Sequence, residues 1–421
     1  MKILVLYPHV PWPLDRGTHH RTFHLLRELA AAHEVSLVAL AEEGAGAEHA
    51  DLFRKFCRSV EVIPFVHPPW PKLFPKRLLN PLPPNVAHWT SPAVAARLNE
   101  ICARERFDAV HVCDIVMAQY FMASDYPLII DRSRVDLQYQ LAEHSRMNFP
   151  LRARLLRCEG YAKLWRFERQ IARRAALQIV CGPDDEAFLR RWVRRDAAIE
   201  VLVNGVDAHY FAPDSPGACG AKPTALFCGA MDYNPNIDAL RWYFAEMHDA
   251  LRCAIPDFQF LIVGKNPTPE IAAFAARPGV TVTGPVADVR PYYRRAWLQL
   301  VPLRIGGGTR LKIVESLSIG TPVVSTSIGA QGLDLADGRE ILIGDTAAAF
   351  VGQTLRALND ADLRKRFAGA GIAVAQSRFD WPRIGGRLRE IYARLGVGHG
   401  EHAAAVRPPG LSLNPAGIAR R

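Results

Sequence analysis

The chain has 421 residues, of which 49% are hydrophobic and 22% are charged, a composition typical of a soluble globular protein. No apolar run reaches the ~18 residues that span a bilayer, and the opening segment predicts a buried strand, not a signal peptide. Because one hydrophobic core rarely serves a chain of this length, we expect two domains.

The net charge of +10 favours anionic partners. The chain has no aromatic-basic RNA-binding signature and no recognisable helix-turn-helix, so nucleic acid is the least supported partner. Much of the excess charge lies in residues 146–195, where Arg alternates with Leu and aromatic residues at helical spacing. This pattern indicates either a solvated helix face, the commoner case, or a cationic surface that contacts anionic lipid.

The eight cysteines are scattered, without a CxxC pair or the Cys/His spacing of a metal site. Cys113, Cys181 and Cys228 lie in apolar, strand-like runs, so we expect reduced core residues in a cytoplasmic protein. The sequence also lacks an Asp-x-Asp in a metal-binding setting. We therefore expect no metal and no other cofactor.

The first half of the chain alternates between strand and helix patterns, which predicts a parallel sheet with helices on both faces. The expected strands are Lys2–Tyr7, Glu34–Leu40, Val60–Val66, Asp108–Cys113, Pro127–Asp131 and Leu177–Cys181, and the expected helices include Thr18–Ala32, Ser91–Arg104 and Cys158–Arg174. The Pro-rich segment 67–89 mixes apolar and basic residues. It is either a plain surface loop or a loop that enters a membrane interface or surrounds an amphipathic acceptor.

A second series of the same kind follows a Pro/Gly-rich boundary. Its expected strands are Thr224–Cys228, Phe258–Val263, Val280–Thr283, Leu298–Val301, Pro322–Ser325 and Ile341–Ile343, with helices at Ile237–Leu251 and Arg383–Leu395. We predict an α/β fold of two doubly wound, Rossmann-like domains that face a central cleft. The expected parts are a first domain 1–203, a linker 204–223, a second domain 224–378, a returning helix 379–396 and a disordered tail 397–421.

A glycine-rich loop leads into a helix in the second domain. It comprises Gly306, Gly307, Gly308, Thr309, Arg310, Leu311 and Lys312, with Glu315 one turn further on. Glycines let the backbone approach a ligand closely, and the helix N-terminus offers free N–H groups to phosphate. Two cations and a hydroxyl-binding carboxylate beside them match a nucleotide-sugar, and the alternative is a plain strand-to-helix turn.

The segment after the first strand lacks GxGxxG, which argues against an ordinary nicotinamide dehydrogenase. Instead, Asp15, Gly17, Thr18 and His19 lead into a helix. Gly17 is expected to expose N–H groups, Thr18 to cap the helix, and Asp15 and His19 to reach an acceptor hydroxyl or a phosphate. The alternative is a capped helix with solvated His residues.

An ordered set of motifs covers nearly the whole second half: residues 203–213, 227–236, 263–264, 282–292, 301–304 and 306–333. This set resembles the GT-B-fold glycosyltransferases of the large retaining family 4. It is most similar to the sugar transferase subgroup found with bacterial exopolysaccharide and PEP-CTERM protein-sorting gene clusters. The first half matches that family only in its first strand, in Gly17 and in its general rhythm.

The resemblance implies a metal-independent, retaining hexosyltransferase that moves a sugar from a nucleotide-sugar onto a glycan acceptor. The acceptor would be lipid-linked and bound by the first domain, in exopolysaccharide or cell-surface glycan synthesis. The second domain would bind the donor, with Gly284, Val286 and Asp288 at the base, Glu315 at the ribose, and residues 306–312 at the sugar and diphosphate.

Two departures concern the donor site. Gly307 stands where the first Glu of the family's E-x7-E signature is expected, and residues 230–236 lack the Arg and Lys that commonly bind the diphosphate. Arg310 and Lys312 would then supply the catalytic positive charge. Without such a group, the transition state loses about 3 kcal/mol of stabilisation.

A third departure lies after the fifth expected strand, where the family often carries a His. This chain has Asp131, Arg132 and Asp136 there as candidates for acceptor binding, and we take Asp131 and Arg132 as catalytic candidates as well. Retaining members resemble a same-face displacement in which the departing diphosphate helps to take the proton. A separate base is therefore not required.

Two other functions remain open. A nucleotide-sugar epimerase of the same fold would need no acceptor, and a non-catalytic nucleotide-sugar-binding partner would bind without turnover. For the transferase we expect a cytoplasmic location, peripheral on the inner face of the plasma membrane.

Overall fold

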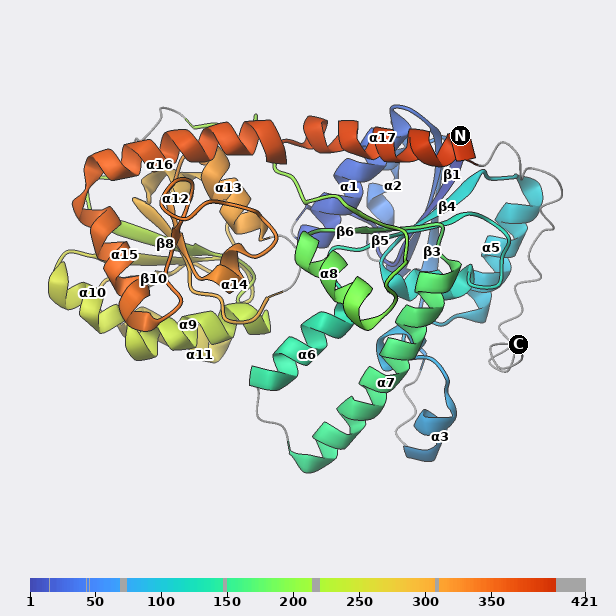
Figure 1. The fold of residues 1–421 in the computed structure, drawn as a ribbon, viewed down its shortest axis with the longest axis horizontal. Coiled ribbons are helices and arrows are strands. Elements are labelled where there is room, and N and C mark those ends of the chain that lie inside the picture. The colour runs from blue at the N-terminus through green and yellow to red at the C-terminus, as the bar shows by residue number, and fades with distance from the viewer. Residues whose placement is uncertain are drawn as a thin grey trace. The chain divides into compact units, whose positions relative to one another are not determined.

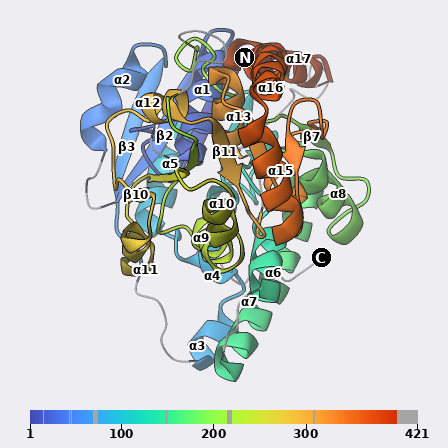
Figure 2. The same cartoon turned by 90° about the vertical axis from the view of Figure 1, so that its left-hand side faces the viewer.

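The computed structural model describes residues 1–398, except 15, 43, 45, 69–73, 147–149, 214–219 and 307–309. The chain divides into two compact units, Met1–Leu202 with the residues from Gly385 onward, and Val203–Ile384. Each unit contains a parallel sheet with helices on both faces (Figures 1 and 2). The predicted α/β fold of two doubly wound domains is therefore confirmed.

The sheet of the first unit has the order β3-β2-β1-β4-β5-β6-β7, and every pairing in it is parallel. The strands are β1 (Lys2–Tyr7), β2 (Glu34–Glu42), β3 (Ser59–Phe65), β4 (Ala109–Cys113), β5 (Leu128–Asp131), β6 (Leu177–Val180) and β7 (Ile199–Val201). The strand order reverses between β1 and β4, so loops that leave these two strands diverge and open a crevice at their carboxyl ends. The sequence patterns missed β7, a three-residue strand at the edge of the sheet.

The helices of the first unit include one long element that the periodicity located only in part. They are α1 (Gly17–Ala30), α2 (Ala50–Arg54), α3 (Phe74–Leu79), α4 (Pro84–Ala87), α5 (Pro92–Arg104), α6 (Asp136–Arg146), α7 (Leu151–Arg174) and α8 (Pro183–Trp192), with short turns η1 (Ala47–His49) and η2 (Ile115–Tyr120). Helix α7 begins seven residues before its predicted start at Cys158, directly after the extended Pro150. Its inner side buries Leu164, Phe167 and Ile171.

The sheet of the second unit has the order β10-β9-β8-β11-β12-β13 and is also parallel. Its strands are β8 (Thr224–Cys228), β9 (Gln259–Val263), β10 (Val280–Val282), β11 (Leu298–Val301), β12 (Val323–Ser325) and β13 (Leu342–Ile343). Its helical segments are α9 (Asn234–Glu246), α10 (His248–Ala254), α11 (Pro269–Ala273), η3 (Phe274–Ala276), α12 (Arg290–Arg295), α13 (Leu311–Ile319), α14 (Ser327–Ala330), α15 (Ala347–Asn359), α16 (Ala361–Val374) and η4 (Ala375–Phe379). The order reverses between β8 and β11, which places the second switch point there.

The last described helix, α17 (Trp381–Gly398), returns the chain to the first unit. Arg389 of α17 forms an ion pair with Glu28 of α1, and the Tyr392 hydroxyl lies 2.5 Å from Nδ1 of His111 in β4. Both Tyr392 and His111 are fully buried, so α17 completes the core of the first unit. Among the described helices, none combines the length and the apolar character that crossing a membrane requires.

Candidate functional site

The switch point of the second unit positions the most distinctive chemistry of the chain. Strand β8 ends at Cys228, and α13 begins at Leu311 after the loop that follows neighbouring strand β11. Loops that diverge from adjacent parallel strands leave a crevice at their carboxyl ends, and the helix N-terminus contributes a positive dipole end to it.

Two glycines keep the strand ends in this crevice free of side chains. A Cβ atom added to Gly264, after β9, would lie 1.6 Å from the carbonyl oxygen of Gly229, after β8. A Cβ atom on Gly229 would itself lie 3.1 Å from Nζ of Lys312. Both residues have a backbone φ of 155°, which residues with a side chain rarely adopt.

The ammonium group of Lys312 is fixed in position by two side chains. Its Nζ donates a hydrogen bond of 2.8 Å to Oδ1 of Asn236 and lies 4.1 Å from the centre of the Phe227 ring. The Asn236 amide is oriented in turn by donating to the carbonyl of Ala230 at 2.8 Å. The pKa of Lys312 is lowered to about 7, mainly by burial; the charge of Arg310 acts in the same direction, whereas Cys228 and Glu315 act to raise the pKa.

The carboxylate of Glu315 lies one turn along α13 from Lys312. One of its oxygens accepts a hydrogen bond of 2.9 Å from the hydroxyl of Tyr293, which is fully buried. In the described part of the chain, no hydrogen bond engages its other oxygen. Burial raises the pKa of Glu315, and both the Tyr293 hydrogen bond and Lys312 lower it. This arrangement suits a carboxylate that accepts hydrogen bonds from ligand hydroxyls.

The glycine-rich loop is described only at its two ends. Gly307, Gly308 and Thr309 lie outside the described residues. At the flanks, a Cβ atom on Gly306 would lie 1.9 Å from Nη2 of Arg310, so the guanidinium group packs against the loop backbone. Arg310 is buried and precedes α13 as its N-cap residue, which brings its charge to the end of the helix where Lys312 lies.

The three residues predicted at the nucleotide base follow β10 along the same edge of the sheet. Gly284 has a φ of 69° and open space where a side chain would lie, and Val286 packs partly against the core. The Asp288 carboxylate accepts hydrogen bonds from the backbone and the guanidinium of Arg290, whose side chain stacks over Tyr210 at 3.8 Å. Because its side chain is engaged, Asp288 would offer a ligand mainly its backbone.

In the first unit, Asp131 and Arg132 are buried and paired. Arg21 donates to both oxygens of Asp131, at 2.6 and 2.9 Å, and to the carbonyl of Leu202 at 2.8 Å. Arg132 donates to Glu168 at 2.8 Å. A direct contact with an acceptor would require breaking these pairs, so the structure gives both residues a role in packing.

Arg132 and Asp136 each have further hydrogen-bond partners. Arg132 also donates to Gln178 at 2.6 Å, and Asp136 accepts from Arg134 at 2.9 Å and from Asn85 at 3.3 Å. The contacts of Asp136 lie at the start of α6, where a carboxylate complements the helix dipole. These interactions account for Asp131, Arg132 and Asp136 within the fold itself.

The loop after β1 differs from its prediction in one detail. Asp15 lies outside the described residues, and Gly17 begins α1, with Arg16 in an extended conformation as the N-cap residue. The prediction that Thr18 caps the helix was wrong, because α1 starts one residue earlier; the Thr18 hydroxyl is hydrogen-bonded with Tyr7 instead. His19 is buried, with Nδ1 2.8 Å from the carbonyl of Pro13.

Sequence reasoning missed Asp114, which follows β4 at the first unit's switch point. Its φ of 105° is strained for a residue other than glycine, and such strain concentrates at functional sites. Its carboxylate accepts a hydrogen bond of 3.2 Å from the Val116 N–H. The pKa of Asp114 is raised to about 6, mainly by burial and also by the charge of Asp136. Its place directly after a predicted strand was the signal available in the sequence.

Sequence reasoning also missed a cluster formed by the ends of three neighbouring strands. Glu42, the last residue of β2, places one carboxylate oxygen 2.9 Å from Nδ1 of His9 and the other 2.8 Å from Nε2 of His67. The His67 ring stacks on His88 with ring centres 3.8 Å apart, and the Trp89 ring contacts His9 edge-on. Burial lowers the pKa of His9 to about 4, which Glu42 opposes.

Two protein-family models match the two halves of the chain. A "Glycosyl transferase 4-like domain" matches residues 16–205, and "Glycosyl transferases group 1" matches residues 222–360. The chain belongs to the GT-B glycosyltransferases. The expected membership in a 4-like, group 1 family is thereby confirmed, whereas the exopolysaccharide subgroup and the retaining mechanism remain predictions.

The GT-B family also supplies structures that align along nearly the whole chain. A sucrose-phosphate synthase from Thermosynechococcus elongatus is 20% identical with a TM-score of 0.70, and the alignment covers 94% of this chain and 99% of that one. Anabaena HepE, solved in complex with UDP and glucose, is 16% identical with a TM-score of 0.67 and covers 94% and 100%. These likenesses establish the fold.

Two sequence relatives match the chain over a shorter length. A phosphatidyl-myo-inositol mannosyltransferase of Mycobacterium leprae is 28% identical over 215 residues, 48% of this chain and 56% of that protein. A 44.6 kDa protein of the Klebsiella pneumoniae cps region is 23% identical over 167 residues, 38% and 43% of the two chains. The chain thus spans about half the length of the curated relatives that it matches.

Proposed function

We propose that this protein transfers a hexose from a nucleoside-diphosphate sugar to a glycan hydroxyl with retention of configuration. The second unit binds the donor, and the first unit binds the acceptor, a lipid-linked saccharide in bacterial exopolysaccharide or cell-surface glycan synthesis. The observation that carries the proposal is the ammonium of Lys312 at the switch point, 2.8 Å from Asn236, with Glu315 one turn along the same helix.

The chemistry of these groups matches the parts of a nucleotide-sugar. Lys312 and the N–H groups at the start of α13 bind the diphosphate and stabilise the negative charge that develops as it leaves. Glu315 accepts hydrogen bonds from the ribose hydroxyls, and the backbone after Gly284 contacts the base. Because these groups already provide positive charge, the proposed reaction needs no divalent cation.

The acceptor side is proposed from the carboxyl ends of β1, β2, β3 and β4. Asp114, with a pKa near 6, accepts a hydrogen bond from a sugar hydroxyl, and the His9–Glu42–His67 cluster binds further hydroxyls. Imidazole and carboxylate groups beside the Trp89 ring form a surface suited to a saccharide. A HepE structure with UDP and glucose supports a sugar-nucleotide site in this fold.

The test begins with the donor. Calorimetry with UDP, GDP and ADP and their hexose conjugates identifies the nucleotide, and an NMR assay then follows transfer to lipid-linked acceptors with and without a chelator. We expect an α-linked product from an α-linked donor at the same rate in both conditions. Donor epimerisation without an acceptor would establish the epimerase, and binding without turnover would establish the non-catalytic partner.

Replacing Glu315 with alanine should weaken binding of the nucleoside diphosphate ~10- to 100-fold, because hydrogen bonds to a charged group contribute roughly 1.5–3 kcal/mol. The measurement is calorimetry with the ribonucleotide and with its 2′-deoxy or 3′-deoxy analogue. Wild type should bind the ribonucleotide more tightly than at least one analogue, whereas Glu315→Ala should bind the ribonucleotide and the analogues with equal affinity. Tyr293→Phe, which retains the carboxylate, is the control. Unchanged discrimination in Glu315→Ala would remove Glu315 from the ribose site.

Asp114→Gly should separate stability from activity. Glycine adopts a φ of 105° without strain, so the free energy of unfolding should stay level or rise by up to ~2 kcal/mol despite loss of the Val116 hydrogen bond. Transfer should fall ~10-fold or more, because the carboxylate is gone. Asp114→Asn, which keeps the turn but not the charge, should show a similar loss. Wild-type transfer by Asp114→Gly would contradict the acceptor role.

A further inference from the structure

Helix α7 presents a continuous stripe of exposed or half-buried side chains to solvent. Apart from the adjacent Trp165 and Arg166, its positions follow one another at intervals of three or four residues, so they lie on one side of the helix. The stripe consists of Leu151, Leu155, Cys158, Ala162, Trp165, Arg166, Arg169 and Arg173. Along the first four turns these side chains are apolar or weakly polar, and along the last two turns they are cationic.

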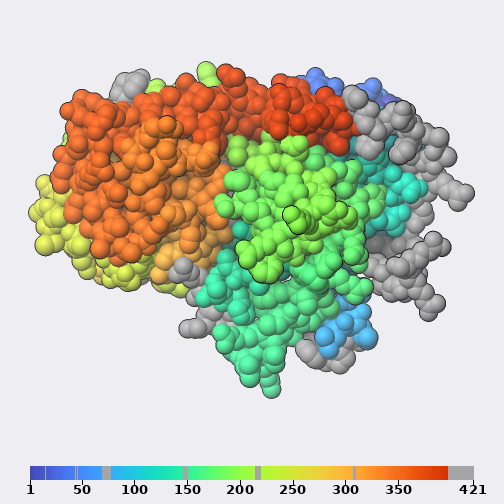
Figure 3. Space-filling model, in the orientation of Figure 1, coloured from blue at the N-terminus to red at the C-terminus, as the bar shows by residue number. Residues whose placement is uncertain are grey.

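The apolar part of the stripe is unusually exposed for a helix in a globular unit. Leu151 is 73% exposed, Leu155 is 62% exposed and Trp165 is 42% exposed, although the opposite side of α7 buries its own apolar residues in the core. In the space-filling view, α7 and α8 form adjoining parts of one visible face (Figure 3). A face that only contacts water would not be expected to expose two leucines and a tryptophan in line.

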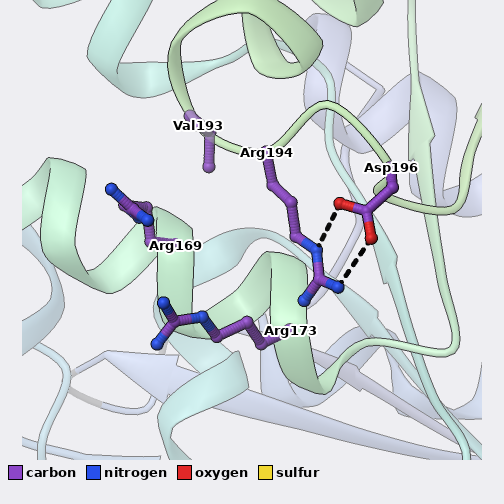
Figure 4. A pocket seen from close by; sticks show the side chains of 5 residues that line it. All are labelled: Arg169, Arg173, Val193, Arg194 and Asp196. Carbon is purple, nitrogen blue, oxygen red and sulfur yellow. Dashed lines mark hydrogen bonds and ion pairs between the residues drawn. The ribbon is translucent and has the colours of Figure 1, made fainter.

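The cationic end of the stripe opens into a hollow of about 310 Å³ between α7 and the loop after α8 (Figure 4). It is lined by Arg169, Arg173, Val193, Arg194 and Asp196. Arg194 forms hydrogen bonds of 2.8 Å with Asp196, whereas Arg173 has no hydrogen bond or ion pair within the described residues. Three guanidinium groups share one carboxylate, so the hollow carries two excess positive charges.

Two tryptophans flank this hollow and are fixed to each other. Nε1 of Trp165 donates a hydrogen bond of 2.7 Å to the carbonyl of Trp192. Trp192 is the last residue of α8, and it is 55% exposed. Arg169 lies over the Trp165 ring at 4.8 Å, and Arg191 lies over the Trp192 ring at 5.0 Å. Tryptophan is the side chain that prefers the boundary between lipid headgroups and acyl chains.

The Pro-rich segment singled out in the sequence contributes α3 to the same region. Nε of Arg77 in α3 donates to Glu159 of α7 at 2.9 Å, and Lys163 of α7 donates to the Arg77 carbonyl at 2.7 Å. Both ribbon views show α3 beside α7 (Figures 1 and 2). Leu79 at the end of α3 is 82% exposed, which adds an apolar side chain next to α7.

We propose that the outer stripe of α7, with the Arg169–Arg173–Arg194 hollow, docks the first unit onto an anionic phospholipid bilayer. A lipid phosphate binds among the three guanidinium groups, and Leu151, Leu155 and Trp165 enter the interface beside it. Charge complementarity favours lipid over a protein partner, because the exposed apolar side chains continue directly into unpaired positive charge. The docking does not depend on the proposed transfer reaction.

The test is sedimentation of the full chain with vesicles of phosphatidylcholine alone and of phosphatidylcholine with phosphatidylglycerol. We expect binding only to the anionic vesicles, weakening as salt is raised. Arg169→Gln/Arg173→Gln should lower the partition coefficient ~20-fold, because each basic residue near the surface contributes a factor of about 5. Leu151→Ser/Leu155→Ser should also bind more weakly, but with an unchanged dependence on salt.

The matched control is Lys365→Gln/Arg366→Gln, which removes the same charge from an exposed part of α16 in the second unit. This variant should bind vesicles as tightly as wild type does. If its binding weakens as much as that of Arg169→Gln/Arg173→Gln, net charge alone drives binding and the proposal is overturned. Inorganic phosphate should not displace the protein at the phosphate concentration of the vesicles. Displacement by phosphate would assign the hollow to a soluble anion and overturn the proposal. As a folding control, each variant should have the same thermal unfolding temperature as wild type.

Discussion

Lys312→Ala should transfer sugar at least ~100-fold more slowly than wild type with saturating donor. The ammonium of Lys312 is fixed between Asn236 and Phe227 at the switch point, where the leaving diphosphate would gain negative charge in the proposed reaction. Removing one such group costs about 3 kcal/mol of transition-state stabilisation, which corresponds to this factor. The measurement is kcat in the transfer assay, and Lys365→Ala, an exposed lysine of α16, is the control.

The pH dependence provides a second measurement on the same residue. Burial lowers the pKa of Lys312 to about 7, so the free enzyme carries this positive charge below pH 7 and loses it above. We therefore expect kcat/KM to fall as the pH rises through 7. The bound diphosphate favours the charged lysine, so kcat should fall only at a higher pH. Lys312→Arg should remove the decline near pH 7, and an unshifted decline in that variant would assign it to another group.

Asp131→Ala should lower the free energy of unfolding by about 3–5 kcal/mol, because it leaves the guanidinium of Arg21 buried without its carboxylate. Arg21 is 1% exposed and Asp131 is 2% exposed, so water cannot compensate for the loss. The measurement is the urea midpoint of unfolding, with the slope of the transition monitored to confirm that the same surface is exposed.

A double variant separates packing from chemistry at this pair. Arg21→Met/Asp131→Leu removes both charges together and should recover most of the stability, since replacing a buried ion pair with apolar side chains is often neutral. If Asp131 acts only in packing, the double variant will transfer sugar at a rate close to that of wild type. A stable but inactive double variant would instead support the prediction that Asp131 binds the acceptor.

The residues of the proposed donor site could be selected from the sequence because they are close together in it. Glycines, cations and Glu315 lie within ten residues of one another, and a helix pattern fixes their spacing. The structure adds the partners that tune them: Asn236 and Phe227 come from 76 and 85 positions earlier in the chain. A lowered pKa of Lys312 results from burial by these distant residues, which no local motif indicates.

The acceptor side depended on information that the sequence patterns do not contain. Glu42 interacts with His9 and His67 only because β1, β2 and β3 are neighbours in one parallel sheet. The strained backbone of Asp114 leaves no mark in composition or periodicity. Conversely, the charged residues after β5 suggested chemistry, but burial against α1 and α7 gave Asp131 and Arg132 ion-pair partners.

The return of the chain through α17 has a consequence for synthesis on the ribosome. Glu28 and His111 meet their partners Arg389 and Tyr392 only after 361 and 281 further residues have been made. The second unit, encoded between these points, emerges complete while the first unit still lacks a helix of its core. The first unit to be started is therefore the last to be finished, and a nascent chain stopped before Gly385 should expose the apolar surface that α17 covers.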